Sequence, residues 1–264
     1  MPAPSLAEVL DILHEIAPLE LAAEWDNVGL LLQPNRRPGR VRRVLLTIDL
    51  GDAVVAEAKR ARADLVVSYH PPIFQPLRRL RHDDAKGRTL LLAAAAGLPV
   101  YSPHTALDAA PSGLADWLAA GVLGGAAPKE LRPCGDGEFG RIVKLERPLP
   151  MATLLTRLRR HLGVRNLQLA KPAQRRAAVR TVAVAAGAGG SVLRGAAADV
   201  YVTGEMSHHD ALAAVAAGTT VVLAGHSNTE RGFLPVLRKR LRAAFGGDLD
   251  VGLARADRDP FTPA

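Results

Sequence analysis

Four short clusters of histidine and acidic residues carry most of the chemistry that this sequence could perform. They read Ser-Tyr-His-Pro at 68–71, His-Thr-Ala-Leu-Asp at 104–108, Gly-Glu-Met-Ser-His-His-Asp at 204–210 and Gly-His-Ser-Asn-Thr-Glu at 225–230. Each follows an apolar, β-branched run of the kind that forms strands. Ligands of open α/β sheets bind at the carboxyl ends of strands, where these clusters stand. Converging imidazoles and carboxylates there would make a metal site with nitrogen and oxygen ligands.

Each histidine also has a simpler explanation when it is taken alone. His70 stands between a strand pattern and Pro71-Pro72, which hold the strand exit extended, so it could merely end a strand. His104 and Asp108 are four residues apart, which puts them on one side of a helical turn. Asp108 would equally suit a cap for the helix expected after Pro111.

The last cluster has the strongest alternative explanation. Ser227 and Glu230 fit a capping box, which would make Glu230 part of a helix start rather than a metal ligand. Three strand ends that all bear histidine are nevertheless hard to explain separately. Together they supply three imidazoles and two carboxylates, enough for one ion with an open position or for a bridged pair.

The other polar residues near these clusters are weaker candidates. His208 and His209 precede a helix, so they form either an exposed first turn or a wall of the pocket, and Glu205 is placed in the same class. Trp25 is interpreted as a packing anchor. The glycine-rich segment 187–191 could bind an anion at a helix start, but tight strand-to-helix packing explains it equally well.

The elements that must position these residues alternate between strand and helix patterns. Strands are expected at 28–32, 41–48, 65–68, 99–102, 140–145, 166–170, 179–184, 200–203, 220–223 and 249–253. Helices are expected from a capping box at Ser5 and at 52–62, 86–96, 111–120, 151–162, 191–198, 209–217 and 230–245. This order predicts the α/β class with parallel strands.

The domain organisation follows from where the metal-type residues fall. We predict two α/β lobes facing each other with a metal-binding cleft between them, a usual place for a pocket. Residues 1–120 and about 180–264 would together form the metal-binding core. Residues 121–179 would supply a linker, rich in glycine and proline over 121–137, and smaller connecting α/β elements. Alternatively, the whole chain forms one domain.

Composition narrows the class of protein. The chain has 264 residues, 48% hydrophobic and only 4% aromatic, so a core must be built from Leu, Val and Ala. A single cysteine, Cys134, excludes an intramolecular disulfide and a cysteine-rich zinc module. With no apolar stretch long enough for a bilayer and no secretory signal pattern, we expect a soluble cytoplasmic protein without membrane partners.

The net charge of +8 raises the question of nucleic-acid binding. The excess is mostly arginine, at 36–37, 42–43, 78–81, 157–160, 175–176 and 238–242. The groups near 157 and 238 recur within helical turns, and no aromatic residues are interleaved as base-stacking platforms. We therefore favour a solvated surface over a nucleic-acid footprint.

The clusters together resemble the motifs of the Nif-three-like family, also called GTP cyclohydrolase 1 type 2 homologs. The matching motifs stand at 24–29 (Glu-Trp-Asp-Asn-Val-Gly), 68–72, 104–108, 203–210 and 225–231, in the same order and nearly end to end. The resemblance implies a two-lobed α/β fold with a dinuclear metal centre, assembled into ring-like hexamers. It implies ligands at His70, Asp108, His226 and Glu230, with Glu230 bridging, and it places His104 close to the metals.

One departure from the family pattern concerns Tyr69. Many bacterial members carry two adjacent histidines where this chain has Tyr69-His70, so the chain is similar to the Ser-Tyr-His-Pro-Pro variant of eukaryotic members. The change removes one imidazole, so either one or two ions per chain are compatible with the pattern. Tyr69 would either bind an ion itself or support the residues that do. The chain also lacks the long middle insertion of some bacterial members and resembles a short form.

The resemblance also frames the function. The family name implies hydrolytic opening of the guanine imidazole ring of GTP, and other members are binding partners of proteins. Our leading hypothesis is a metal-dependent hydrolase that acts on a nucleotide or related purine-like substrate through metal-activated water. A carboxylate or His104 would move the proton. The alternatives are a non-catalytic metal-stabilised scaffold for protein partners and a basic nucleic-acid-binding protein. Zn, Mn and Fe all suit these ligands.

Overall fold

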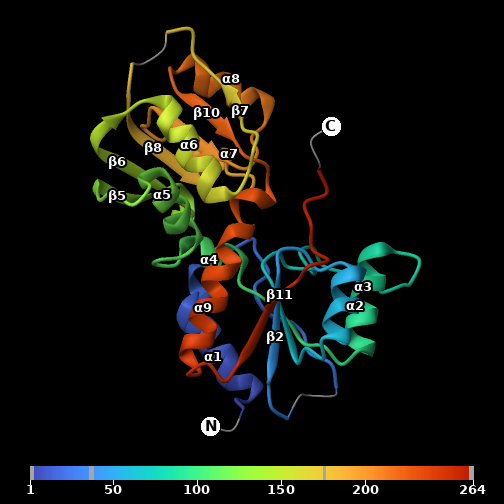
Figure 1. The fold of residues 1–264 in the computed structure, drawn as a ribbon. Helices are drawn as coiled ribbons and strands as arrows, with labels where there is room; N and C mark the ends of the chain where they lie inside the picture. Colours follow the sequence, from blue (N-terminus) through green and yellow to red (C-terminus); the bar gives the residue numbers. More distant parts are fainter. Residues whose placement is uncertain (1–2, 36–38, 175–176, 262–264) are drawn as a thin grey trace. The chain divides into compact units, whose positions relative to one another are not determined.

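The computed structural model describes residues 3–35, 39–174 and 177–261. The arginine pairs at 36–37 and 175–176 lie outside these ranges. The chain divides into two compact units, each with its own sheet and helices (Figure 1). The first unit comprises the residues up to Leu107 and those from Leu234 onward, and the second is Asp108–Phe233. The predicted α/β class is confirmed.

The first unit contains a five-stranded sheet in the order β1-β4-β3-β2-β11. Strands β4, β3, β2 and β11 are parallel, and β1 runs antiparallel to β4 at the edge. The bounds are β1 (Gly29–Leu32), β2 (Arg43–Thr47), β3 (Leu65–Ser68), β4 (Val100–Ser102) and β11 (Asp250–Leu253). β3 is buried along its whole length, because helices cover both faces of a parallel sheet and its strands become continuous apolar runs.

Helices cover both faces of this sheet. They are α1 (Leu6–Ile16), α2 (Asp52–Arg60), α3 (Ala85–Ala95) and α9 (Leu234–Ala244), with a short turn η1 (Leu19–Leu21). α2 and α3 pack together on one face, and α1 and α9 lie on the other (Figure 1). The predicted capping box at the start of α1 is confirmed, since the Ser5 hydroxyl accepts from the amide of Glu8 and the Ser5 amide donates to the Glu8 carboxylate.

The second unit contains a six-stranded sheet in the order β5-β6-β8-β9-β10-β7. Its centre is the parallel set β8, β9 and β10, flanked by antiparallel β6 and β7. The bounds are β5 (Pro128–Cys134), β6 (Gly140–Leu149), β7 (Gln168–Ala170), β8 (Val179–Ala185), β9 (Val200–Thr203) and β10 (Thr220–Leu223).

Two pairs of helices cover this second sheet. α5 (Leu114–Leu123) and α6 (Met151–Leu162) pack against each other and place Leu118, Leu154 and Leu158 in a core with β6, β8 and β9. α7 (Gly190–Leu193) and α8 (His208–Ala216) cover the other face, where Leu193 and Ala214 pack. Short turns complete the unit: α4 (His104–Ala109), which begins in the first unit, η2 (Asp136–Glu138), η3 (Ser227–Thr229) and η4 (Arg231–Phe233).

The segment 121–137, for which the sequence predicts a linker, is structured instead. It contains the end of α5 and the strand β5, which pairs antiparallel with β6. The prediction was wrong because Pro128 and Pro133 argued against a strand. β5 is the outermost strand of its sheet, and prolines are tolerated at sheet edges, where an amide need not be paired.

A buried arginine ties α4 to the second sheet. Arg141 on β6 is 5% exposed and forms an ion pair with Asp116 of α5. Its guanidinium also donates to the carbonyl of Ala109, 3.1 Å away, at the end of α4. Because Ala109 follows Asp108 directly, these bonds fix the backbone beside that candidate ligand.

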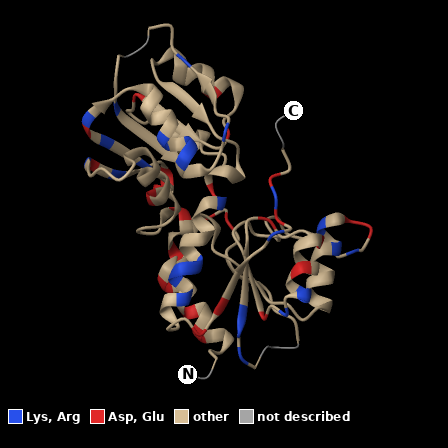
Figure 2. Cartoon of the chain, viewed as in Figure 1, with Lys and Arg blue, Asp and Glu red and all other residues tan. Residues whose placement is uncertain are grey.

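Basic residues lie mainly on helices and loops. The predicted arginine-bearing helical turns are confirmed, on α6 and α9, and Figure 2 shows Asp and Glu interspersed elsewhere among the Lys and Arg. Within the described ranges, every helix is too short or too polar to traverse a lipid bilayer.

Candidate metal centre

Three polar side chains follow three neighbouring parallel strands of the first unit. Asp49, His70 and His104 each stand two residues beyond the last residue of β2, β3 and β4. The register pairs Thr47 of β2 with Ser68 of β3, so the ends of these strands lie side by side. Strand ends in register therefore bring together residues that lie far apart in the sequence.

His70 is held by a carboxylate and by backbone bonds. Its Nδ1 lies 2.9 Å from Oδ1 of Asp49, and its amide donates to the carbonyl of Ile48. The buried hydroxyl of Ser68 donates to the His70 carbonyl at 2.7 Å. A carboxylate only accepts, so Nδ1 carries the proton and Nε2 is the nitrogen that can face an ion. Asp49 was not among the residues selected from the sequence.

His104 is held in the same manner by Asp26. Its Nδ1 lies 2.8 and 2.9 Å from the two carboxylate oxygens of Asp26, whose side chain is fully buried. The amides of Asn27 and Thr105 also donate to this carboxylate. His104 has a φ of +30°, an unfavourable value for a residue with a side chain, and such strain is concentrated at functional positions.

The charge state of Asp26 follows from its surroundings. Burial raises the pKa of this carboxyl, but the hydrogen bonds from His104 and Thr105 outweigh burial and hold the pKa below its ordinary value. Asp26 is therefore ionised at neutral pH and fixes the tautomer of His104. Sequence reasoning passed over Asp26, because it stands in a turn before β1 and far from any histidine in the sequence.

Aromatic rings surround the two histidines of the first unit. Tyr69 is buried, and its ring centroid lies 5.0 Å from that of His70 and 5.5 Å from that of His104. The interpretation of Trp25 as a packing anchor was wrong, because it is 63% exposed. Trp25 and Phe74 instead lie edge-to-face at 5.9 Å and border the His104 ring.

The second unit repeats the pairing of a carboxylate with an imidazole. Glu205 stands two residues beyond β9 and His226 three residues beyond the neighbouring β10. The Glu205 Oε1 lies 2.7 Å from Nδ1 of His226, so Nε2 is again the nitrogen left to face an ion. Glu205, predicted as a pocket wall, thus contacts a candidate ligand directly.

Glu230 lies next to the other ring nitrogen of His226. Its Oε1 is 3.3 Å from Nε2 of His226, and its side chain is 2% exposed. The chain forms the short turn η3 here, and the next α-helix begins only at Leu234. Glu230 is therefore not in the first turn of an α-helix, which removes the main argument for the capping box.

A glycine lets these two groups approach each other. Gly187 follows β8 with a φ of +54°, and a Cβ there would lie 2.7 Å from Oε1 of Glu230 and 2.9 Å from Nε2 of His226. Its amide donates to the hydroxyl of Thr229 at 2.9 Å. The Gly189 amide donates to Thr203, so the glycine-rich segment serves tight packing at the strand ends, which favours that explanation over anion binding.

Of the remaining predicted site residues, Asp108 is buried, whereas His208 and His209 are exposed. Asp108 is 9% exposed and lies in α4, four residues after His104. His208 and His209 are exposed in the first turn of α8, where the Ser207 hydroxyl accepts from the amide of Asp210. Their rings lie 5.5 Å from each other.

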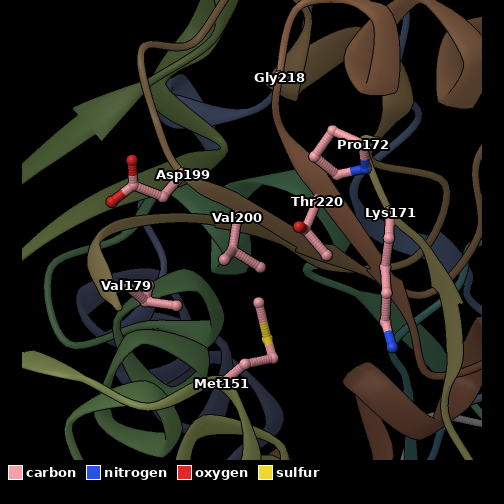
Figure 3. A pocket seen from close by; sticks show the side chains of 8 residues that line it. All are labelled: Met151, Lys171, Pro172, Val179, Asp199, Val200, Gly218 and Thr220. Carbon is pink, nitrogen blue, oxygen red and sulfur yellow. The ribbon is translucent and has the colours of Figure 1, made fainter. Parts of the chain in front are cut away.

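A separate cavity of about 140 Å³ lies at the opposite ends of the parallel strands of the second unit. Figure 3 shows its lining, in which Val179, Val200 and Thr220 are the first residues of β8, β9 and β10. Its one carboxylate, Asp199, accepts from the amides of Arg180 and Thr181 at 2.7 and 3.0 Å. The Asp199 carboxylate thus links the start of β8 to the start of β9. The cavity therefore lacks the paired imidazoles and carboxylates of the candidate metal centre.

Comparison with known proteins decides the family. A family model described as Duf34/NIF3 (NGG1p interacting factor 3) matches residues 4–260. The chain belongs to this family. Family membership, which the motifs predicted, is therefore confirmed. Among curated NIF3 relatives, the protein NIF3 homolog of Schizosaccharomyces pombe is 41% identical over 92% of each chain. NIF3-like protein 1 of Homo sapiens is 32% identical over 97% of this chain and 92% of its own length.

Solved structures share the NIF3 fold. A Bacillus cereus protein related to NIF3 superposes with a TM-score of 0.84 at 20% identity, covering all of both chains. Reduced HcgD from Methanocaldococcus jannaschii superposes with a TM-score of 0.82 at 24% identity, covering 95% of this chain and 98% of its own. At these identities the likeness extends to the fold alone.

Proposed function

We propose that this NIF3 protein is a metal-dependent hydrolase whose ligands are His70, Asp108, His226 and Glu230. One observation carries the proposal: each of three strand-end imidazoles, His70, His104 and His226, has its Nδ1 bonded to a carboxylate. Histidines that bind metals usually donate their second N–H to such a partner, which orients the ring and strengthens the ligand. The donor set His70, His226 and Glu230 combines imidazole and carboxylate, which suits divalent Zn, Mn or Fe.

The chemistry divides between the ion and the side chains. When bound, a divalent ion supplies Lewis acidity and generates a nucleophile from water near neutral pH. His104 is our candidate for moving the proton, because Asp26 fixes its Nδ1–H and leaves Nε2 to exchange. By family resemblance, the substrate is a nucleotide or related purine-like compound. One or two ions per chain are compatible with the replacement of an imidazole by Tyr69.

The test combines metal analysis with turnover. Protein purified without added metal is analysed for elements and then screened against GTP and other nucleotides. We expect His226→Ala to lose both bound metal and turnover. His208→Ala, which removes an exposed histidine of α8, serves as the matched control and should keep both. Turnover that persists in a metal-free His226→Ala protein would contradict the proposal.

A scaffold for protein partners is the second candidate. The observation in its favour is that the family description and the Saccharomyces cerevisiae relative, NGG1-interacting factor 3, are named for an interaction with another protein. This relative is 36% identical over 91% of the chain. A scaffold would lose thermal stability on chelation while consuming no substrate. The homohexamer that the family resemblance implies can be tested by light scattering. Binding of this protein to nucleic acid that falls steeply with salt would favour the nucleic-acid alternative.

A further inference from the structure

An exposed pair of aromatic rings borders His104 in the first unit. Trp25 is 63% exposed and meets Phe74 edge-to-face, with ring centroids 5.9 Å apart and planes at 69°. Both rings stand nearly perpendicular to the His104 ring, at centroid distances of 6.4 and 6.2 Å. We propose that Trp25 and Phe74 form a stacking surface for the planar heteroaromatic ring of the substrate, beside the imidazole of His104. This inference rests on the proposed function, whose substrate it would orient.

The distribution of aromatic residues supports a specific use. The whole chain holds two tryptophans, three tyrosines and five phenylalanines, yet Trp25, Tyr69 and Phe74 all gather around the His104 ring. The other tryptophan, Trp117, packs against His161 and Phe233 in the second unit. Burying an indole stabilises a folded protein. An indole that stays exposed beside candidate catalytic groups, as Trp25 does, therefore favours a role in binding.

Backbone connections hold the surface in register with His104. Trp25 directly precedes Asp26, whose carboxylate accepts from His104. The next residue, Asn27, donates its side-chain amide to the carbonyl of Ile73, which directly precedes Phe74. The two rings are therefore anchored by the same turn that orients the imidazole, and a ring stacked on Trp25 would have its edge near His104.

The contacts identify the chemistry of the occupant. An exposed indole face favours a flat, electron-poor or polarisable ring over an aliphatic group, and every nucleobase offers such a face. Since Asp26 occupies Nδ1 of His104, Nε2 is the ring nitrogen that would bond a purine held beside it. A phosphate alone would gain little from this surface, because it has no flat face to stack.

Guanosine is the probe for the experiment, with ribose as the control that lacks a ring. In a Trp117→Phe protein, whose remaining tryptophan is Trp25, guanosine should quench the tryptophan fluorescence and ribose should not. Equilibrium dialysis should show that Trp25→Ala weakens guanosine binding by about 5- to 150-fold, the range found for loss of one base–aromatic stack. Trp25→Phe should recover part of the affinity. Phe261→Ala, which removes another aromatic side chain, 83% exposed, should leave binding unchanged.

The same measurement on His226→Ala separates this inference from the proposed function. Guanosine binding that survives in this metal-free variant supports the stacking surface even if no hydrolysis is found. Equal affinities of wild type and Trp25→Ala would overturn the inference. Failure of acrylamide to quench the fluorescence of the Trp117→Phe protein would also overturn it, because the indole of Trp25 would then be covered by a second copy or another protein.

Discussion

The two units place histidines on the same kind of scaffold but surround them differently. In each unit a carboxylate two residues beyond one parallel strand accepts from an imidazole just beyond the next strand, as in Asp49 with His70 and Glu205 with His226. The first unit lines its histidines with aromatic rings. The second places Gly187 against its imidazole and carboxylate. On the two proposals made above, the first unit contacts a flat ligand and the second brings candidate metal ligands close together, so mutations should separate these roles.

The largest effect is expected at Gly187. In Gly187→Ala, the added methyl would stand 2.7 Å from Oε1 of Glu230 and 2.9 Å from Nε2 of His226, closer than nonbonded carbon contacts allow. The two groups must separate, and we expect metal affinity to fall by about 100-fold or more, since outer-shell changes alone cost 10- to 100-fold. Isothermal titration with Zn or Mn measures this loss.

Gly195→Ala is the matched control for that substitution. Gly195 has a φ of +75°, so alanine meets the same backbone strain, but nothing lies within 4 Å of the added Cβ. The control should lose about 1–2 kcal/mol of stability and keep its metal affinity. If both variants lost metal equally, backbone strain rather than the close approach would explain the Gly187 result.

A smaller effect is expected at the carboxylates that bond Nδ1 of the histidines. It should fall on stability for Asp26 and on metal affinity for Glu205. The side chain of Asp26 is fully buried, whereas that of Glu205 is 55% exposed. Asp26→Asn should therefore lower the free energy of unfolding by about 1–3 kcal/mol, because it disturbs buried donors. Glu205→Gln should change stability by less than about 0.5 kcal/mol while it weakens metal binding by about tenfold. Urea unfolding and metal titration of both variants measure the contrast.

The pH dependence of Asp26 has a defined sign. Its pKa is lowered in the folded protein, so the unfolded chain binds the proton more readily. Its stabilisation is present above the ordinary carboxyl pKa and is lost as pH falls through the folded value. The difference in unfolding free energy between wild type and Asp26→Asn should thus shrink below about pH 4. A difference that grows in acid would refute this assignment.

The smallest effect is expected at His161, in the second unit. Its ring centroid lies 4.2 Å from that of Trp117, and burial lowers its pKa. The unfolded state then takes up the proton first, so stability should decline as pH falls below about 6.5. His161→Gln should flatten this decline between pH 7.5 and 5.5 in the presence of a chelator, as measured by urea unfolding. The exposed His82→Gln should leave the slope unchanged.

Much of the fold could be predicted from the sequence because its strands are short, continuous apolar runs. Val44 to Thr47 and Val200 to Thr203 are buried residue by residue, which is what a parallel strand between two layers of helices requires. The strand β5 could not be predicted, since its exposed, proline-bearing pattern makes sense only at a sheet edge. Edge position is a property of the whole sheet and leaves no local signal.

The candidate site divides in the same way. The histidines could be selected because each follows a strand pattern. Asp26 and Asp49 could not, because nothing near them in sequence reveals which histidine they bond. Trp25 was misjudged because exposure depends on what packs above a side chain. The resemblance to a family supplied the candidate ligands, whereas the carboxylates behind the imidazoles required three-dimensional positions.

The insertion of the second unit between β4 and α9 has a consequence for synthesis on the ribosome. Strand β11 pairs with β2, and Asp250 bonds Arg43 across a separation of 207 residues. The second unit is continuous in sequence and can fold as soon as it emerges, whereas β2 keeps an unpaired edge until β11 appears. A nascent chain therefore carries an open sheet edge at β2, with its risk of edge-to-edge aggregation, throughout the synthesis of the inserted unit.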